Sequence, residues 1–197
     1  MSLLLAIPAV PAVAAGLLGL AGRRLSYRIV SGAASVAVFG SFCMVLWLCF
    51  SAGSLFPLPG APETSWDWLA SASLQVPVRF RFDNLALCMA LLVSGFGFVI
   101  VLYSVQYMEH DEEPSRYFAS ISLFVASMLL LVLADNVIIL YMGWEGVGVC
   151  SYLLIGHYWK EMGTPDAAAK AIIVNRVGDL FFLFGIFLLY RLCGTLN

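Results

Sequence analysis

The fold is decided by residues 133–158, which read L-A-D-N-V-I-I-L-Y-M-G-W-E-G-V-G-V-C-S-Y-L-L-I-G-H-Y. Within this stretch, residues 136–156 form an apolar run in which the single charged residue is Glu145. About 20 residues of α-helix cross a hydrocarbon core of roughly 30 Å. The run therefore predicts a transmembrane helix over residues 136–156 that carries an acid near its middle.

Five further stretches are long and apolar enough to cross a membrane. They lie at residues 3–22, 29–51, 84–108, 117–134 and 168–192. Of the 197 residues, 62% are hydrophobic and 11% are charged, with a mean hydropathy of +0.95, whereas a typical soluble domain is about a quarter charged. The sequence predicts an all-α polytopic membrane protein with six transmembrane helices, folded as one membrane domain over residues 1–197.

The same composition argues against several classes of function. The net charge is -2 and the arginines form no extended basic stripe, so we expect lipids as partners and no nucleic acid. The five cysteines lie in or beside apolar stretches without a C-x-x-C pair, which favours packing roles over a zinc site or disulfides. The sequence contains no G-x-G-x-x-G motif, P-loop or paired-histidine haem site. No cofactor or metal site is predicted in this chain.

The distribution of basic residues predicts the orientation of the helices. Alternate crossings place Arg23, Arg24, Arg28, Arg116, Lys160 and Lys170 on one side, and Arg79, Arg81 and Arg191 on the other. The first side is therefore expected to be the inner one, with the N-terminus outside. No basic residue precedes the first apolar stretch, so we expect a retained helix there and not a cleaved secretory signal.

Two of the connecting segments have features of their own. In residues 54–83, apolar residues alternate with others from Gln75 to Phe82, and this period of two predicts a short β-hairpin-like loop at the membrane surface. Residues 109–113 form an acidic run, which we interpret as a solvated inner loop. His157 closes the fifth helix as a capping or surface residue, from where it could also pass protons at the inner mouth.

Glu145 is the residue that most needs explaining. It lies about 15 Å along the fifth helix from Asp135, near the midplane of the membrane. An acid at that depth costs at least about 2.5 kcal/mol on insertion scales, and such residues usually face a bundle interior or a hydrated path. A proton or ion route is therefore the first hypothesis for its function.

The sixth helix carries three more charges, on Lys170, Arg176 and Asp179. Arg176 and Asp179 are spaced three residues apart, so they can pair, and the turn before this helix should bring Asp179 nearly to the depth of Glu145. The protonation of such a cluster belongs to the group and not to one residue. The alternative is structural: an Arg176 to Asp179 pair joins helices, while Glu145 is held protonated and hydrogen-bonded.

Several motifs of this chain resemble those of one family. Residues 133–158 and K-A-I-I-V-N-R-V-G-D at 170–179 closely resemble chain 5 (subunit L) of NADH:quinone oxidoreductase, respiratory complex I. Y-S-V-Q-Y-M at 103–108 and F-D-N-L at 82–85 are similar to the same subunit. The resemblance covers nearly the whole chain and is weakest over residues 1–75.

The resemblance implies an antiporter-like fold and a role in proton translocation. It implies that Glu145 is the glutamate of the family's fifth helix, and that Lys170, Arg176 and Asp179 lie near the proton path. It also implies partners: other membrane-arm subunits of complex I, and subunits that bind NADH, FMN, iron–sulfur clusters and quinone. The expected activity is that of the complex, a proton-translocating NADH:ubiquinone reductase, with no redox site in this chain.

Length is the main departure from the family pattern. The family member is about three times longer and carries, on a broken seventh helix, the lysine partner of the glutamate. The chain is therefore expected to be part of a split subunit or a truncated piece, with a second polypeptide supplying the remaining helices. V-N-R-V-G-D is similar to mitochondrial and related bacterial versions of the subunit. A short split chain favours a mitochondrial inner membrane, with a bacterial plasma membrane as the alternative. A subunit of a multisubunit cation/proton antiporter and a non-transporting structural or assembly fragment are the alternative functions.

Overall fold

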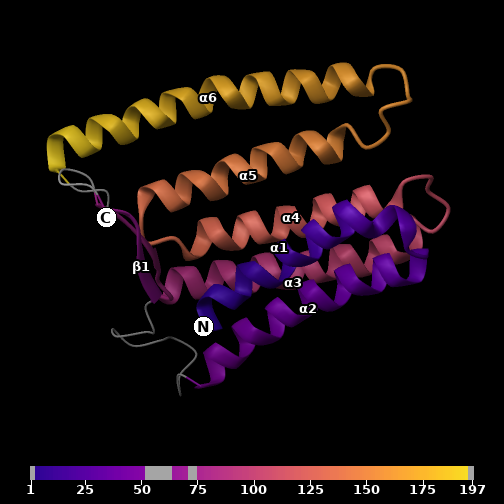
Figure 1. The fold of residues 1–197 in the computed structure, drawn as a ribbon, viewed down its shortest axis with the longest axis horizontal. Coiled ribbons are helices and arrows are strands. Elements are labelled where there is room, and N and C mark those ends of the chain that lie inside the picture. Colours follow the sequence, from indigo (N-terminus) through magenta and orange to yellow (C-terminus); the bar gives the residue numbers. More distant parts are fainter. Residues whose placement is uncertain (1–2, 52–63, 71–74, 195–197) are drawn as a thin grey trace.

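Six long helices make up most of the part of the chain that the structure describes (Figure 1). The structure, a computed structural model, describes residues 3–51, 64–70 and 75–194. The helices are α1 (Leu3–Ala21), α2 (Tyr27–Ser51), α3 (Asn84–Tyr107), α4 (Pro114–Leu133), α5 (Val137–Ile155) and α6 (Thr164–Cys193), with a short 3₁₀ turn η1 (Gly22–Arg24) after α1. All six are long and apolar enough to cross a membrane. The predicted fold class is confirmed.

The helix boundaries agree with the sequence-based ones to within four residues, and the differences have local causes. α6 begins earlier than predicted because Pro165 lies in its first turn, where a missing N–H breaks no helical hydrogen bond. Asp135 lies two residues before α5. Asn136 caps α5 by accepting a hydrogen bond from the Ile138 amide at 2.8 Å, and Asp135 instead pairs with Arg81 at 3.1 Å.

The first four helices form a compact bundle, and the last two extend it sideways (Figure 1). α1 packs against α2 and α4, and α2 packs against α3 and α4. α5 packs on α4, and the main contact surface of α6 is α5. Most of α6 is consequently exposed, with 11% of its most apolar window buried in this chain. α6 depends on α5 for its position.

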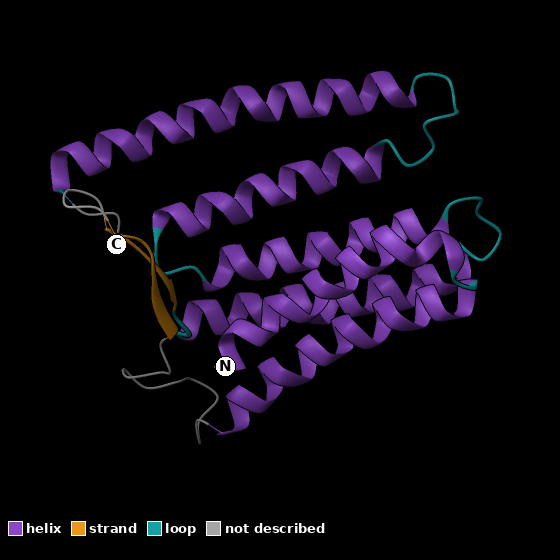
Figure 2. Cartoon of the chain, in the orientation of Figure 1, coloured by secondary structure: helices purple, strands orange, loops and turns teal. Residues whose placement is uncertain are grey.

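The predicted hairpin is present between α2 and α3 (Figure 2). Strands β1 (Thr64–Ala70) and β2 (Gln75–Phe80) pair antiparallel, with an irregularity between Asp67 and Leu69. The end of β2 is fastened to the α4–α5 junction through backbone hydrogen bonds, from the Arg81 amide to the Leu133 carbonyl and from the Asp135 amide to the Arg79 carbonyl. The hairpin therefore holds the start of α5 in place.

Glycines allow α5 to approach α4 closely. A Cβ on Gly143 would lie 2.7 Å from the backbone nitrogen of Leu131, and one on Gly146 would lie 2.5 Å from the Ser127 hydroxyl. Small residues at such positions let membrane helices pack backbone to backbone. Since the face of α5 that carries Gly143 and Gly146 packs against α4, Glu145 is turned towards α6.

We predict that Gly143→Ala destabilises the helix bundle. The new methyl group would meet the Leu131 backbone, and such overpacking typically costs about 1–3 kcal/mol. This cost exceeds the stabilisation from the higher helix propensity of alanine. Gly16→Ala in α1 is the matched control, because a Cβ there meets nothing within 4 Å. Unfolding titrations in lipid bicelles would measure both variants. Equal stability of the two would contradict the close α4–α5 approach.

Candidate functional site

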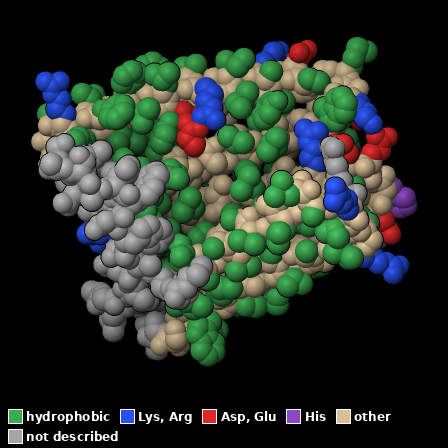
Figure 3. All heavy atoms as spheres, viewed as in Figure 1, with side chains coloured by type: hydrophobic (Ala, Val, Ile, Leu, Met, Phe, Trp, Pro, Cys, Tyr) green, Lys and Arg blue, Asp and Glu red, His purple; other side chains and the backbone are tan. Residues whose placement is uncertain are grey.

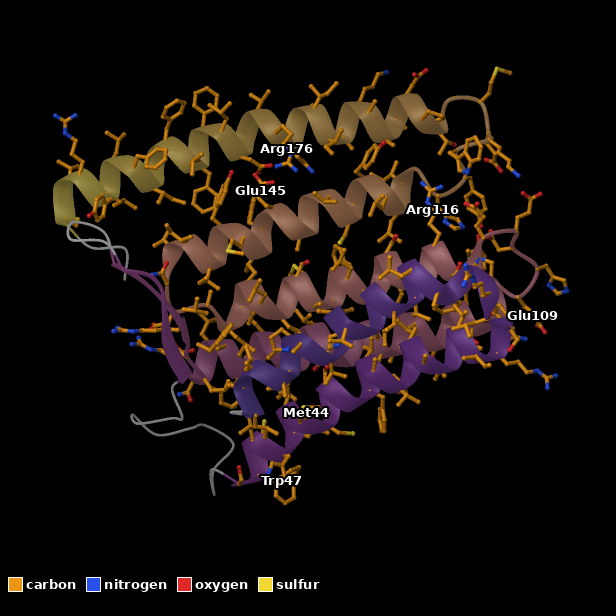
Figure 4. All side chains as sticks on the ribbon, in the orientation of Figure 1. Met44, Trp47, Glu109, Arg116, Glu145 and Arg176 are labelled. Carbon is orange, nitrogen blue, oxygen red and sulfur yellow. The ribbon has the colours of Figure 1, made fainter. Side chains whose placement is uncertain are left out.

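Three charged side chains from α5 and α6 meet halfway along the bundle (Figure 4). Arg176 forms an ion pair with Glu145 across the two helices, and its Nη1 lies 3.8 Å from Oδ2 of Asp179 on its own helix. The exposed fraction of the side chain falls from 45% for Arg176 to 23% for Glu145 and 7% for Asp179. One cation thus lies between two acids, one of which is buried.

Two aromatic side chains complete the cluster. The hydroxyl of Tyr141 donates a hydrogen bond to Oε1 of Glu145 at 2.6 Å, and Nε1 of Trp144 donates to Oδ1 of Asp179 at 2.7 Å. Each carboxylate therefore has a hydrogen-bond donor as well as Arg176 nearby. Neither donor was predicted from the sequence. Tyr141 was detectable, because it lies one turn before Glu145, whereas the Trp144 contact crosses between helices.

The arrangement of the charges differs in detail from the expected one. The sequence predicted that Glu145, Arg176 and Asp179 would interact, and the structure brings them together. Spacing along the helix favoured Asp179 as the partner of Arg176, but Glu145 is its closer contact. One oxygen of Asp179 already accepts from Trp144, and the long arginine side chain reaches across to α5. Glu145 therefore has its countercharge within this chain.

Lys170 lies apart from this cluster. It is exposed, and no ion pair joins it to Glu145 or Asp179 in the described part of the chain. It precedes Arg176 by about 9 Å of helical rise, towards the loop between α5 and α6. To take part in proton transfer, Lys170 would therefore need a water molecule or a further residue between it and the cluster.

A groove of about 530 Å³ between α5 and α6 leads away from the cluster. Trp144, Asp179 and Phe182 line its deep end, and Ser151 and Asn175 line it closer to the α5–α6 loop. The space exceeds what several water molecules need, and its polar side chains could hold them. The groove therefore joins Ser151 and Asn175 to Asp179 along a mostly apolar lining.

The loops at that end form a second polar cluster. Nε2 of His157 lies 3.2 Å from Oδ1 of Asp111, and both side chains are at least nine-tenths buried. Lys160 pairs with Glu112, whose hydrogen bond raises the pKa of Lys160. The interpretation of residues 109–113 as a solvated loop suits exposed Glu112 but not Asp111. The α5–α6 loop is thereby fastened to the α3–α4 loop.

The residues described contain no group of three His, Cys, Asp or Glu side chains that could hold a metal ion. The face in view in Figure 3 is mostly apolar, and charged side chains gather at the loop end and at one point partway along the helices. This distribution suits a chain whose sides contact lipid or other apolar helices.

Solved structures with the same fold define the class of protein. The whole chain superposes on one fifth of a chain in the Mrp complex from Dietzia sp. DQ12-45-1b, with a TM-score of 0.79 and 26% identity. It also superposes on 39% of a chain of the membrane-bound sulfane sulfur reductase, an archaeal respiratory membrane complex, with a TM-score of 0.80 and 17% identity, which shows the fold alone. The chain is an antiporter-like membrane protein.

Sequence comparisons define the family within this class. Residues 68–118 match the family model "NADH-Ubiquinone oxidoreductase (complex I), chain 5 N-terminus", and residues 134–197 match "NADH:quinone oxidoreductase/Mrp antiporter, TM". The chain belongs to the family of NADH-quinone oxidoreductase subunit L, also called NADH-ubiquinone oxidoreductase chain 5, and corresponds to its N-terminal part.

The individual relatives include two proteins named subunit L and one named chain 5. Subunit L of Pseudomonas aeruginosa is 47% identical over 77% of this chain, and that of Mycobacterium tuberculosis is 40% identical over 96%. Chain 5 of Chondrus crispus is 34% identical over 91%. The matched segment spans 25%, 30% and 27% of these three relatives, respectively.

We predict that Arg176→Gln destabilises the chain and that the effect depends on Glu145. Without the guanidinium, two carboxylates lose their countercharge, and leaving such groups unpaired costs about 1–3 kcal/mol or more. In a Glu145→Gln background the loss should be smaller, since one of the two acids is already neutral. A double-mutant cycle of unfolding free energies in bicelles measures this coupling.

Arg191→Gln serves as the control for that cycle, because Arg191 is an exposed residue in the last turn of the same helix. It should change stability by no more than about 0.5 kcal/mol. Strict additivity of Arg176→Gln and Glu145→Gln would show that the two side chains are not coupled.

Proposed function

We propose that the chain is a proton-translocating component of the membrane arm of respiratory complex I. The observation that carries this proposal is the cluster in which Arg176 lies between Glu145 and Asp179 at mid-membrane depth. Ionisable residues in that position are expensive and are typical of ion and proton pathways. Family membership and the likeness to the Mrp complex support the same function.

The geometry suggests how the cluster could respond to a proton. Arg176 contacts Glu145 and lies 3.8 Å from Asp179, so one cation is shared by two acids. When a proton neutralises one acid, the attraction of Arg176 for the other dominates, because opposite charges interact strongly in a medium of low dielectric constant. Each protonation is then coupled to a shift of the guanidinium. The groove past Asn175 and Ser151 would supply the proton by way of water.

The rest of the machinery belongs to partner chains in this proposal. NADH, FMN, iron–sulfur clusters and quinone bind to other subunits, and the redox reaction acts on the cluster from a distance. The family's later helices, which carry the seventh-helix lysine, cover the exposed side of α6. That side presents apolar residues such as Phe181, Phe184 and Leu188 together with half-exposed Arg176. The membrane would be a mitochondrial inner membrane or a bacterial plasma membrane.

A subunit of a multisubunit cation/proton antiporter is the second candidate function. The structural likeness to the Mrp complex, at 26% identity, favours it specifically, and the same acid and arginine could serve either transport process. Purification of the native assembly separates the two. Flavin and iron–sulfur absorbance in the purified complex supports the respiratory function, whereas a cation-dependent proton exchanger lacking both supports the antiporter.

We predict that Glu145→Gln in the assembled complex preserves NADH oxidation but lowers the number of protons moved per electron. The amide keeps the size of the side chain and can still accept from Tyr141, but it cannot take up a proton or neutralise Arg176. Reconstituted proteoliposomes would report NADH oxidation and proton uptake in parallel.

Glu161→Gln is the control, since Glu161 is an exposed acid in the α5–α6 loop. It should leave both activities unchanged. An unaltered proton-to-electron ratio in Glu145→Gln would refute a direct transport role, and the same result in Glu145→Gln/Asp179→Asn would favour the non-transporting fragment.

A further inference from the structure

A second groove lies between the loop ends of α2 and α3, well away from the Glu145 cluster. It has a volume of about 880 Å³. One wall is formed by the first turns of α2 and the other by the last turn of α3 and the residues after it. The Tyr27 hydroxyl donates a hydrogen bond to the Val105 carbonyl and ties the two walls together. This hydrogen bond fixes the two walls relative to each other.

The groove carries one cation and one anion that are not paired with each other. Arg28 on α2 and Glu109 after α3 both line it, and both are exposed. In the described part of the chain neither takes part in an ion pair, whereas nearby Lys160 and Arg116 are paired with Glu112 and Glu113. Figure 4 shows Glu109 at the loop end of α3, on the side of the bundle away from α5 and α6.

Polar and apolar groups are ordered along this groove in the way that a phospholipid requires. Around the two charges lie the hydroxyl of Ser26 and the amide of Gln106. Nearer the middle of the helices the exposed side chains become apolar. Leu102 lines the groove, and Val36, Phe39, Phe96 and Val99 lie beyond it on α2 and α3. The charges therefore lie beside an apolar surface that acyl chains can cover.

The depth of the charges also matches that of a lipid headgroup. Arg28 is in the first turn of a 25-residue apolar helix, and Glu109 follows directly after a 24-residue one. Tyr103 and Tyr107 stack on each other at 5.8 Å on α3 and are mostly exposed. Exposed tyrosines at the ends of membrane helices are typical of the interface between hydrocarbon and headgroups. The groove thus opens at the interface and not in bulk water.

We propose that this groove binds a phospholipid whose headgroup joins a phosphate to a primary ammonium, as in the ethanolamine phospholipids. Arg28 receives the phosphate, because a guanidinium forms strong charge-assisted hydrogen bonds to phosphate oxygens. Glu109 receives the ammonium, whose three N–H donors also reach Gln106. A choline headgroup has no N–H to donate, and a headgroup with only negative charge meets the Glu109 carboxylate. The two charges together therefore select the headgroup.

Lipid titration with native mass spectrometry tests this selection on the native assembly. The assembly is delipidated and titrated with ethanolamine, choline and glycerol phospholipids that have identical acyl chains. The ethanolamine lipid should bind about tenfold more tightly than the choline lipid, as expected for one charge-assisted hydrogen bond, and more tightly than the anionic glycerol lipid.

Two variants separate the two halves of the headgroup. Glu109→Gln should abolish the preference for ethanolamine over choline, while affinity for choline lipid is retained. Arg28→Gln should weaken binding of all three lipids. Glu161→Gln, an exposed acid at the same end of the bundle, is the control and should leave the preference intact.

The proposal is overturned if the ethanolamine and choline lipids bind equally to the unaltered assembly, or if Glu109→Gln keeps the preference. Tightest binding of the glycerol lipid would also overturn it, and would indicate a simple basic surface. Absence of any saturable lipid binding to the delipidated assembly would likewise overturn it.

Discussion

Charge inside hydrocarbon must be neutralised within a few ångströms, and this constraint governs how the second half of the chain is built. Glu145 and Asp179 lie on different helices, and Arg176 is the cation near both. α6 has its main contacts with α5. The ion pair between Arg176 and Glu145 and the hydrogen bond from Trp144 to Asp179 join these same two helices. The polar cluster is thus part of the packing as well as of the proposed transport route.

The position of Glu145 depends on the opposite face of its own helix. Gly143 and Gly146 let α5 lie against the backbone of α4, and no residue with a side chain fits at Gly143 without a shift. This packing against α4 orients Tyr141 and Glu145 towards α6. The hairpin adds a second restraint, because its backbone hydrogen bonds to Leu133 and Asp135 hold the junction from which α5 starts. Structural and candidate functional residues therefore alternate around one helix.

The two ends of the bundle differ in their chemistry. At one end, backbone pairing joins a hairpin to the helices. At the other, side-chain contacts between His157 and Asp111 and between Lys160 and Glu112 join two loops. The second end also holds the opening of the α2–α3 groove with Arg28 and Glu109. Side chains that can exchange protons or bind headgroups are therefore concentrated at the end that the distribution of basic residues predicts to be the inner one.

Sequence alone determined the number of helices, their order, the hairpin and the presence of an acid at mid-membrane depth, because hydropathy and periodicity are local properties that set these features. It also indicated that Glu145, Arg176 and Asp179 would interact, since helical rise places them at similar depth. Only the tertiary structure decided that Arg176 lies closer to Glu145 than to Asp179, that Trp144 reaches Asp179, and that Asp111 is buried against His157. Those contacts depend on how the helices are rotated and how closely they approach each other. The rotation of α5 is set by the close packing of Gly143 against Leu131 on α4, a contact between two different helices.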